Sequence, residues 1–156
     1  MADNVVNHIY FMEKAMAEAR IAFSMNEVPI GCVITLEGKI IASAANTRAT
    51  AKNVLHHAEI LAINKACEVV GDWRLDNCTI YVTLEPCPMC AGAIVQARMP
   101  MLVYGAKSPK SGCAGSIINL LDQENFNHRT EIISGVLEEE SAALMREFFA
   151  RHRSKS

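Results

Sequence analysis

Two cysteines, Cys87 and Cys90, stand three residues apart where the sequence predicts the start of a helix. Side chains three positions apart on a helix share one face, so both sulfur atoms can reach a common metal ion. The free N–H groups and positive dipole end of a helix N-terminus favour thiolate over thiol. The same spacing also suits a redox motif or one half of a structural zinc site. A structural site needs four protein ligands, however, and the sequence has no second CxxC pair.

A third candidate ligand is His57, which precedes Glu59 by two residues at the start of another predicted helix. Taken alone, His57 suits a helix cap, and Glu59 suits a first-turn acid favoured by the helix dipole. Both helix N-termini are expected at the sheet edge where ligands gather in α/β folds. Three protein ligands leave the fourth position of zinc for water, whose pKa zinc lowers to about 7. Glu59 is then placed to take the proton of that water and pass it on.

The elements that must position these residues follow from the hydrophobic pattern. Apolar residues at three- and four-residue steps from Met12 to Phe23 predict a first helix. Further helices are predicted over 57–70, 88–98 and 137–151, the first of them buried on several sides and ended by Gly71. Strands are predicted over 30–36, 40–45, 79–84, 101–104 and 130–134, and a Gly-, Ser- and Lys-rich loop over 108–116.

This order of elements predicts one domain over residues 1–156, a three-layer α/β/α sandwich with a mixed five-stranded sheet. The first two strands flank a tight turn at Glu37-Gly38 and must be antiparallel, whereas the later strands, separated by helices, are expected to be parallel. Hydrophobic residues make up 51% of the 156 and charged residues 21%, which suits a domain with a core and argues against disorder.

The composition also indicates the cellular compartment of the protein and the kinds of partner that it can bind. No run of about 18 apolar residues predicts a membrane span, and the N-terminus lacks the pattern of a signal peptide. The six cysteines are therefore expected to be reduced thiols or metal ligands in a cytoplasmic protein. The net charge of -2 attracts no polyanion globally, so RNA would need a local basic patch. Basic residues that suit such a patch, or otherwise a solvated surface, are Lys107, Lys110, Arg129, Arg146, Arg151, Arg153 and Lys155.

The pattern His57-Ala58-Glu59 followed by Pro86-Cys87-Pro88-Met89-Cys90 is the HxE…PCxxC signature of zinc-dependent cytidine and adenosine deaminases. Over nearly its whole length the chain resembles the bacterial tRNA-specific adenosine deaminases. The resemblance rests on further segments at 27–31 (EVPIG), Asn46, 73–75 (WRL), 81–87 (YVTLEPC), 89–93 (MCAGA), 103–106 (VYGA), 127–129 (NHR) and 148–149 (FF).

The resemblance implies the cytidine-deaminase fold, a homodimer, and conversion of the wobble adenosine in a tRNA anticodon stem-loop to inosine. By position it implies one zinc ion (Zn²⁺) per subunit on His57, Cys87 and Cys90, with Glu59 as the proton shuttle.

The resemblance also implies substrate contacts at Asn46, Ala58 and Asn127, the first with the flipped nucleoside and the last with the anticodon loop. The chain departs from the family where Lys107-Ser108 stands in place of its usual acidic residue after 105–106. Two other readings stay open: deamination of a free nucleobase or nucleoside such as guanine or cytidine on the same fold, and a non-enzymatic zinc or redox module.

Overall fold

The structure is a computed structural model that describes residues 2–153, with side chains from Asn7 onward. Every predicted helix and strand is present, most with ends shifted by one or two residues, whereas the first helix begins at Ala2, ten residues before the predicted Met12. The one element without a sequence prediction is α2, which is a single turn and too short to show a period. In chain order the elements are α1 (Ala2–Ser24), β1 (Gly31–Leu36), β2 (Lys39–Ala45), α2 (Arg48–Ala51), α3 (Ala58–Val70), β3 (Cys78–Leu84), α4 (Pro88–Gln96), β4 (Met101–Ala106), β5 (Glu131–Ile133) and α5 (Glu138–Arg153).

The five strands form one mixed sheet in the order β2-β1-β3-β4-β5. The β1–β2 hairpin is antiparallel, and β4 pairs parallel with both β3 and β5, as predicted. The prediction was wrong for β3, which pairs antiparallel with β1. The crossover through α3 makes β3 run in the direction of β2, which is opposite to that of its neighbour β1. Residues 107–130 join β4 to β5 without a helix, as the predicted helix ranges imply, although the later strands as a group were expected to be separated by helices.

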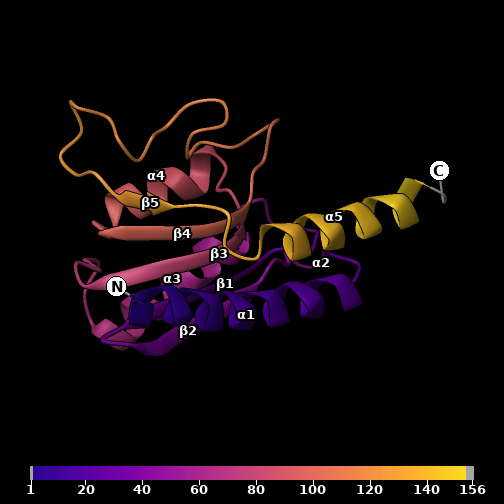
Figure 1. The fold of residues 1–156 in the computed structure, drawn as a ribbon, viewed down its shortest axis with the longest axis horizontal. Coiled ribbons are helices and arrows are strands. Elements are labelled where there is room, and N and C mark those ends of the chain that lie inside the picture. The colour runs from indigo at the N-terminus through magenta and orange to yellow at the C-terminus, as the bar shows by residue number, and fades with distance from the viewer. Residues whose placement is uncertain (1, 154–156) are drawn as a thin grey trace.

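Helices cover both faces of the sheet, so the predicted three-layer α/β/α fold is confirmed (Figure 1). On one face α3 and α4 pack through buried small residues such as Ala62, Ala66 and Ala91. On the other face α1 places Met12 and Ala15 against the sheet. The helix α5 lies near the end of α1 and extends past the sheet (Figure 1). Within residues 2–153, no helix combines the length and apolarity needed to cross a membrane.

Local sequence signals end and begin the two helices that carry the candidate ligands. Gly71 adopts φ 79 and ends α3, and Pro88 occupies the first turn of α4, where its missing N–H costs nothing. The prediction that the helix over 57–70 is buried on several sides was wrong. Val69 exposes 62% of its surface, whereas the buried positions of α3 are Ala58, Glu59, Ala62 and Ala66. The outer face of α3 is exposed to solvent because no further element of the described chain packs on it, and the helix is therefore amphipathic.

Candidate metal centre

His57, Cys87 and Cys90 meet where α3 and α4 begin. His57 is the residue that caps α3, Cys87 is the residue that caps α4, and Cys90 lies in the first turn of α4. The ligand atoms of all three lie within 4.8 Å of one another, and His57 Nδ1 is 3.6 Å from each sulfur. His57 stands at the cap position that one interpretation expected, but neither His57 nor Cys87 makes a side-chain hydrogen bond to its own helix. One nitrogen and two sulfurs are therefore directed at a common point.

This donor set fits a zinc ion, which takes imidazole nitrogen and thiolate sulfur. Among the described residues, no further His, Cys, Asp or Glu joins the group, and both cysteines are free thiols. Glu59 lies beside the group with 4% of its surface exposed, and its Oε1 atom is buried without a hydrogen-bond partner. Leaving a buried polar atom unpaired costs about 1–3 kcal/mol, so this oxygen points to a water molecule or ligand that the site takes up.

The surroundings of the site shift the pKa values of its acidic groups. Burial raises the pKa of Glu59 to about 7, and the nearby Cys87 charge adds to the rise. A carboxyl group with that pKa both takes and releases a proton near neutral pH. A hydrogen bond from Cys90 lowers the pKa of Cys87 to about 4, and the same contact raises the pKa of Cys90. The metal-free pair thus keeps one proton between two sulfurs, and a divalent cation would displace it.

A cavity of about 710 Å³, which we call the metal cavity, opens over this group of candidate ligands. It is a suitable size for a nucleoside, since ligand pockets generally enclose about 300–1,000 Å³. Four parts of the chain form its walls: residues between 28 and 59, the turn from β3 to α4, the end of β4 with the loop that follows it, and α5. The lining residues are Val28, Ile30, Asn46, Arg48, His57, Ala58, Glu59, Leu84, Glu85, Cys87, Ala106, Lys107, Ser108, Pro109, Lys110, Ser111, Ala142, Met145, Arg146 and Phe149.

Two of the three predicted substrate contacts lie in this cavity with the candidate ligands. Asn46 is 4% exposed, donates from Nδ2 to the Val28 carbonyl at 3.1 Å and accepts the Arg48 N–H at 3.2 Å. These two bonds orient its amide and leave one N–H of the amide for a ligand. Ala58 is the first residue of α3 and forms part of the cavity wall.

The third, Asn127, lies elsewhere. It lines a separate cavity of about 310 Å³ beside Gly92, Gln96 and Phe126. Gln96 is the last residue of α4, whereas the candidate ligands stand at its first turn. Within one chain, the structure therefore does not bring Asn127 together with Asn46 and Ala58.

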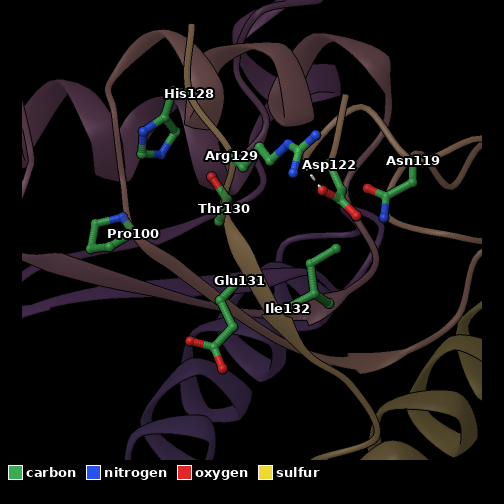
Figure 2. Close-up of a pocket in the computed structure, with 8 residues that line it drawn as sticks. All are labelled: Pro100, Asn119, Asp122, His128, Arg129, Thr130, Glu131 and Ile132. Carbon is green, nitrogen blue, oxygen red and sulfur yellow. Dashed lines mark ion pairs between the residues drawn. The ribbon is translucent and has the colours of Figure 1, made fainter. Parts of the chain in front are cut away.

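The predicted basic patch is divided in the same way. Lys107, Lys110 and Arg146 line the metal cavity. Arg129 lines a different cavity of about 530 Å³ and pairs with Asp122 at 3.4 Å, its side chain pointing away from His128 and Pro100 (Figure 2). Pro100 precedes β4, whereas the metal cavity lies at the far end of that strand, beside Ala106. Arg151 and Arg153 lie in the last turn of α5, and Lys155 falls outside the described residues.

Sequence reasoning missed several cavity residues. Arg48 belongs to α2, for which no pattern was visible, and Met145 gave no chemical signal. Phe149 was noted only as part of a matching segment, yet it is 42% exposed and lines the cavity, while its neighbour Phe148 is buried. An aromatic residue off the apolar stripe of a terminal helix was the one signal that pointed to it.

Residues 6–153 match the family model described as MafB19-like deaminase. The tRNA-specific adenosine deaminase of Bacillus subtilis is 50% identical over 145 residues, which cover 93% of this chain and 90% of that protein. A solved structure from a study of A-to-I editing by tRNA:A34 deaminases at the wobble position of transfer RNA has a TM-score of 0.83 and 45% identity, covering 86% of this chain and 98% of its own.

A guanine deaminase structure from Bacillus subtilis is also similar, at 40% identity and a TM-score of 0.60, but over 63% of each chain. The likeness to the structure from the tRNA:A34 deaminase study therefore spans more of the fold than the likeness to the guanine deaminase.

Proposed function

The chain belongs to the MafB19-like deaminase family and, within it, to the tRNA-specific adenosine deaminases, and we propose that it converts the wobble adenosine of a tRNA anticodon loop to inosine. The reaction consumes one water molecule and releases ammonia. The observation that carries the proposal is the unpartnered Glu59 Oε1 beside one imidazole and two thiols, on the wall of a nucleoside-sized cavity.

We propose that His57, Cys87 and Cys90 hold one zinc ion per subunit. When bound, zinc polarises a water molecule and makes it nucleophilic near neutral pH. Glu59 moves both protons of the attacking water: Oε1 takes the first and delivers it to the adenine ring nitrogen as the hydroxyl adds to C6. The carboxylate then takes the second proton from that hydroxyl and delivers it to the amine, so that C6 keeps a carbonyl oxygen and ammonia leaves. Burial raises the pKa of Glu59, which favours the protonated carboxyl that must donate to the ring nitrogen and to the amine. Asn46 and Ala58 orient the base in the cavity.

The charges around the cavity favour a nucleotide within RNA over a free base. Arg48, Lys107, Lys110 and Arg146 all border it, although the chain as a whole has a net charge of -2. Basic side chains around a base pocket contact the phosphates on either side of a flipped nucleotide. An anticodon loop suits this arrangement, because unstacked loop bases cost least to extrude. We expect the protein to act in the cytoplasm on tRNA.

We further propose that the active form is a homodimer. Asn127 and the 48% exposed Phe126 border a cavity beside α4, away from the metal ligands of their own chain. A Cβ at Gly92 would meet nothing within 4 Å, so this side of α4 is open to a partner. A second copy packed there would allow Asn127 to approach RNA held mainly by the other subunit. Light scattering should then give twice the 17.1 kDa mass of one chain, and a purely monomeric active protein would contradict the proposal.

One assay separates the candidate functions. The zinc-loaded protein is incubated with an anticodon stem-loop that carries adenosine at the wobble position, and inosine is measured by mass spectrometry. A stem-loop with guanosine there, free adenosine and free guanine serve as controls. Inosine in the first RNA alone supports the proposal. Ammonia release from guanine without stem-loop conversion would instead favour the free-base deaminase.

A further inference from the structure

Glu85 lies two residues before Cys87 and carries a buried carboxylate, with 2% of the residue exposed. Its Oε1 accepts the Ser108 N–H at 3.0 Å and the Ser116 hydroxyl. Its Oε2 accepts the N–H groups of Ala114 and Ser116, each at 3.0 Å. All four donors are neutral groups of residues 107–116, which we call the cavity loop. The loop therefore folds around this one carboxylate.

Gly112 shows how closely the loop approaches. A Cβ atom at this position would lie 2.5 Å from both oxygens of Glu85, which is too short for non-bonded atoms. Two backbone bonds hold the loop in the same place: Gly112 N–H to the Ser108 carbonyl at 2.8 Å, and Cys113 N–H to the Pro86 carbonyl at 2.9 Å. The missing side chain of Gly112 is thus a requirement for the loop to surround Glu85.

The first half of the cavity loop is also a wall of the metal cavity, since residues 107–111 line it. Glu85 borders the cavity too, but four donors already occupy its oxygens. It therefore joins two functional parts, the turn that carries Cys87 and the wall that carries Lys107 and Lys110. No other cavity-lining carboxylate bonds to this loop among the described residues.

We propose that Glu85 is a positioning residue, which holds the cavity loop in the conformation that receives the RNA on either side of the flipped nucleotide. The proposal rests on the function proposed above. Without the carboxylate, the N–H groups of Ser108, Ala114 and Ser116 lose their acceptor, and the loop must open to let water replace it. Lys107 and Lys110 then sample many positions, which weakens RNA binding. The groups that carry the chemistry stay in place because α3 and α4 hold them.

The test compares Glu85→Gln and Gly112→Ala, two substitutions that disturb the same contact from opposite sides. Ser116→Ala removes one of the four donors and is a milder variant. Glu68→Gln, the same chemical change at an exposed position on α3, is the matched control. Each protein is measured for amide hydrogen exchange in the cavity loop, zinc content, and kcat and KM on the stem-loop.

In Glu85→Gln and Gly112→Ala, we expect loop exchange and KM to rise about tenfold, the equivalent of one charge-assisted hydrogen bond of about 1.4 kcal/mol. We expect kcat to stay within about twofold and zinc content to stay unchanged. Ser116→Ala should change in the same direction by less, and Glu68→Gln should match the parent.

Two results would overturn the proposal. Unchanged loop exchange in Ser116→Ala and in whichever of the other two variants folds would show that Glu85 does not hold the loop. Loss of zinc or of kcat at unchanged KM would show that Glu85 serves the metal ligands and not the loop. Hydrogen exchange needs no activity, so a parent that leaves the stem-loop unconverted counts against the proposed function, while the exchange data still decide whether Glu85 holds the loop.

Discussion

Removing the Glu59 carboxyl should abolish deamination while leaving the metal in place. Among the acidic residues that line the metal cavity, Glu59 has a buried oxygen without a partner, and the oxygens of Glu85 are taken by four donors. No other carboxylate of the cavity wall can therefore take over the proton transfers in Glu59→Ala. General acid–base catalysis contributes about 10²- to 10⁴-fold, so the activation barrier should rise by about 2.7–5.4 kcal/mol.

The assay is single-turnover conversion of the stem-loop, with zinc per chain measured on the same samples. Glu59→Gln keeps the side-chain volume and should lose as much activity as Glu59→Ala, because the loss comes from the missing proton carrier and not from a void. Cys87→Ala is the contrasting variant and should lose the metal itself. Two results would refute the reasoning: activity in Glu59→Gln within tenfold of the parent, or zinc loss in Glu59→Ala, which would make Glu59 a ligand.

Three further predictions concern pH, salt and packing. Burial alone would raise the pKa of Glu27, but hydrogen bonds from Thr50 and the Ala49 amide, with Arg48 nearby, lower it below its ordinary 4.5. The charged form of Glu27 therefore stabilises the fold above about pH 4.5, and this stability is lost as the pH falls through the lowered pKa. The parent should have a higher Tm than Glu27→Gln at neutral pH, and this difference should disappear in acid. A difference in Tm that persists at about pH 2 contradicts the prediction. The affinity for the stem-loop should fall steeply as the salt concentration rises. Lys107→Ala and Lys110→Ala should each reduce the slope of log affinity against log salt by about 1. A slope identical to that of the parent would show that these side chains do not contact phosphate. In Gly31→Ala the new Cβ would overlap the backbone of Ala15 and Ala19 in α1, so thermal unfolding should show a loss of about 3 kcal/mol, and an unchanged Tm would mean that α1 moves away freely.

The parts of the site that the sequence predicted are those set by near neighbours. Cys87 and Cys90 share a helix turn, and Pro88 starts that turn, so spacing and residue type were enough to predict a chelating pair. Gly71 predicted the end of α3 for the same reason, because a left-handed residue there needs only local backbone freedom. His57 and Glu59 were candidates from their positions at a second helix start, the family signature supported both, and the structure places all four residues at two helix N-termini.

The errors arose where distant segments decide the outcome. The sequence did not show that β3 pairs antiparallel with β1. The connection from β2 to β3 crosses over β1, so β3 lies beside β1 and not beside β2. Asn127 matched a family segment, yet it lies in a cavity beside the end of α4. Glu85 appeared in the sequence only as part of the family segment 81–87, and its hydrogen bonds to residues 107–116 are visible only in the structure.

By itself, the sequence determined the chemistry of this protein: an imidazole, two thiols and a carboxyl group at helix starts, since side-chain type and helix geometry are local properties. Only the tertiary structure decided which other groups share a cavity with them, and it selected Arg48, Lys110 and Phe149 while it separated Asn127 and Arg129. Such groupings depend on strand order and on the path of an irregular loop. Both are set by packing between segments far apart in the chain, which leaves no period or motif in the sequence.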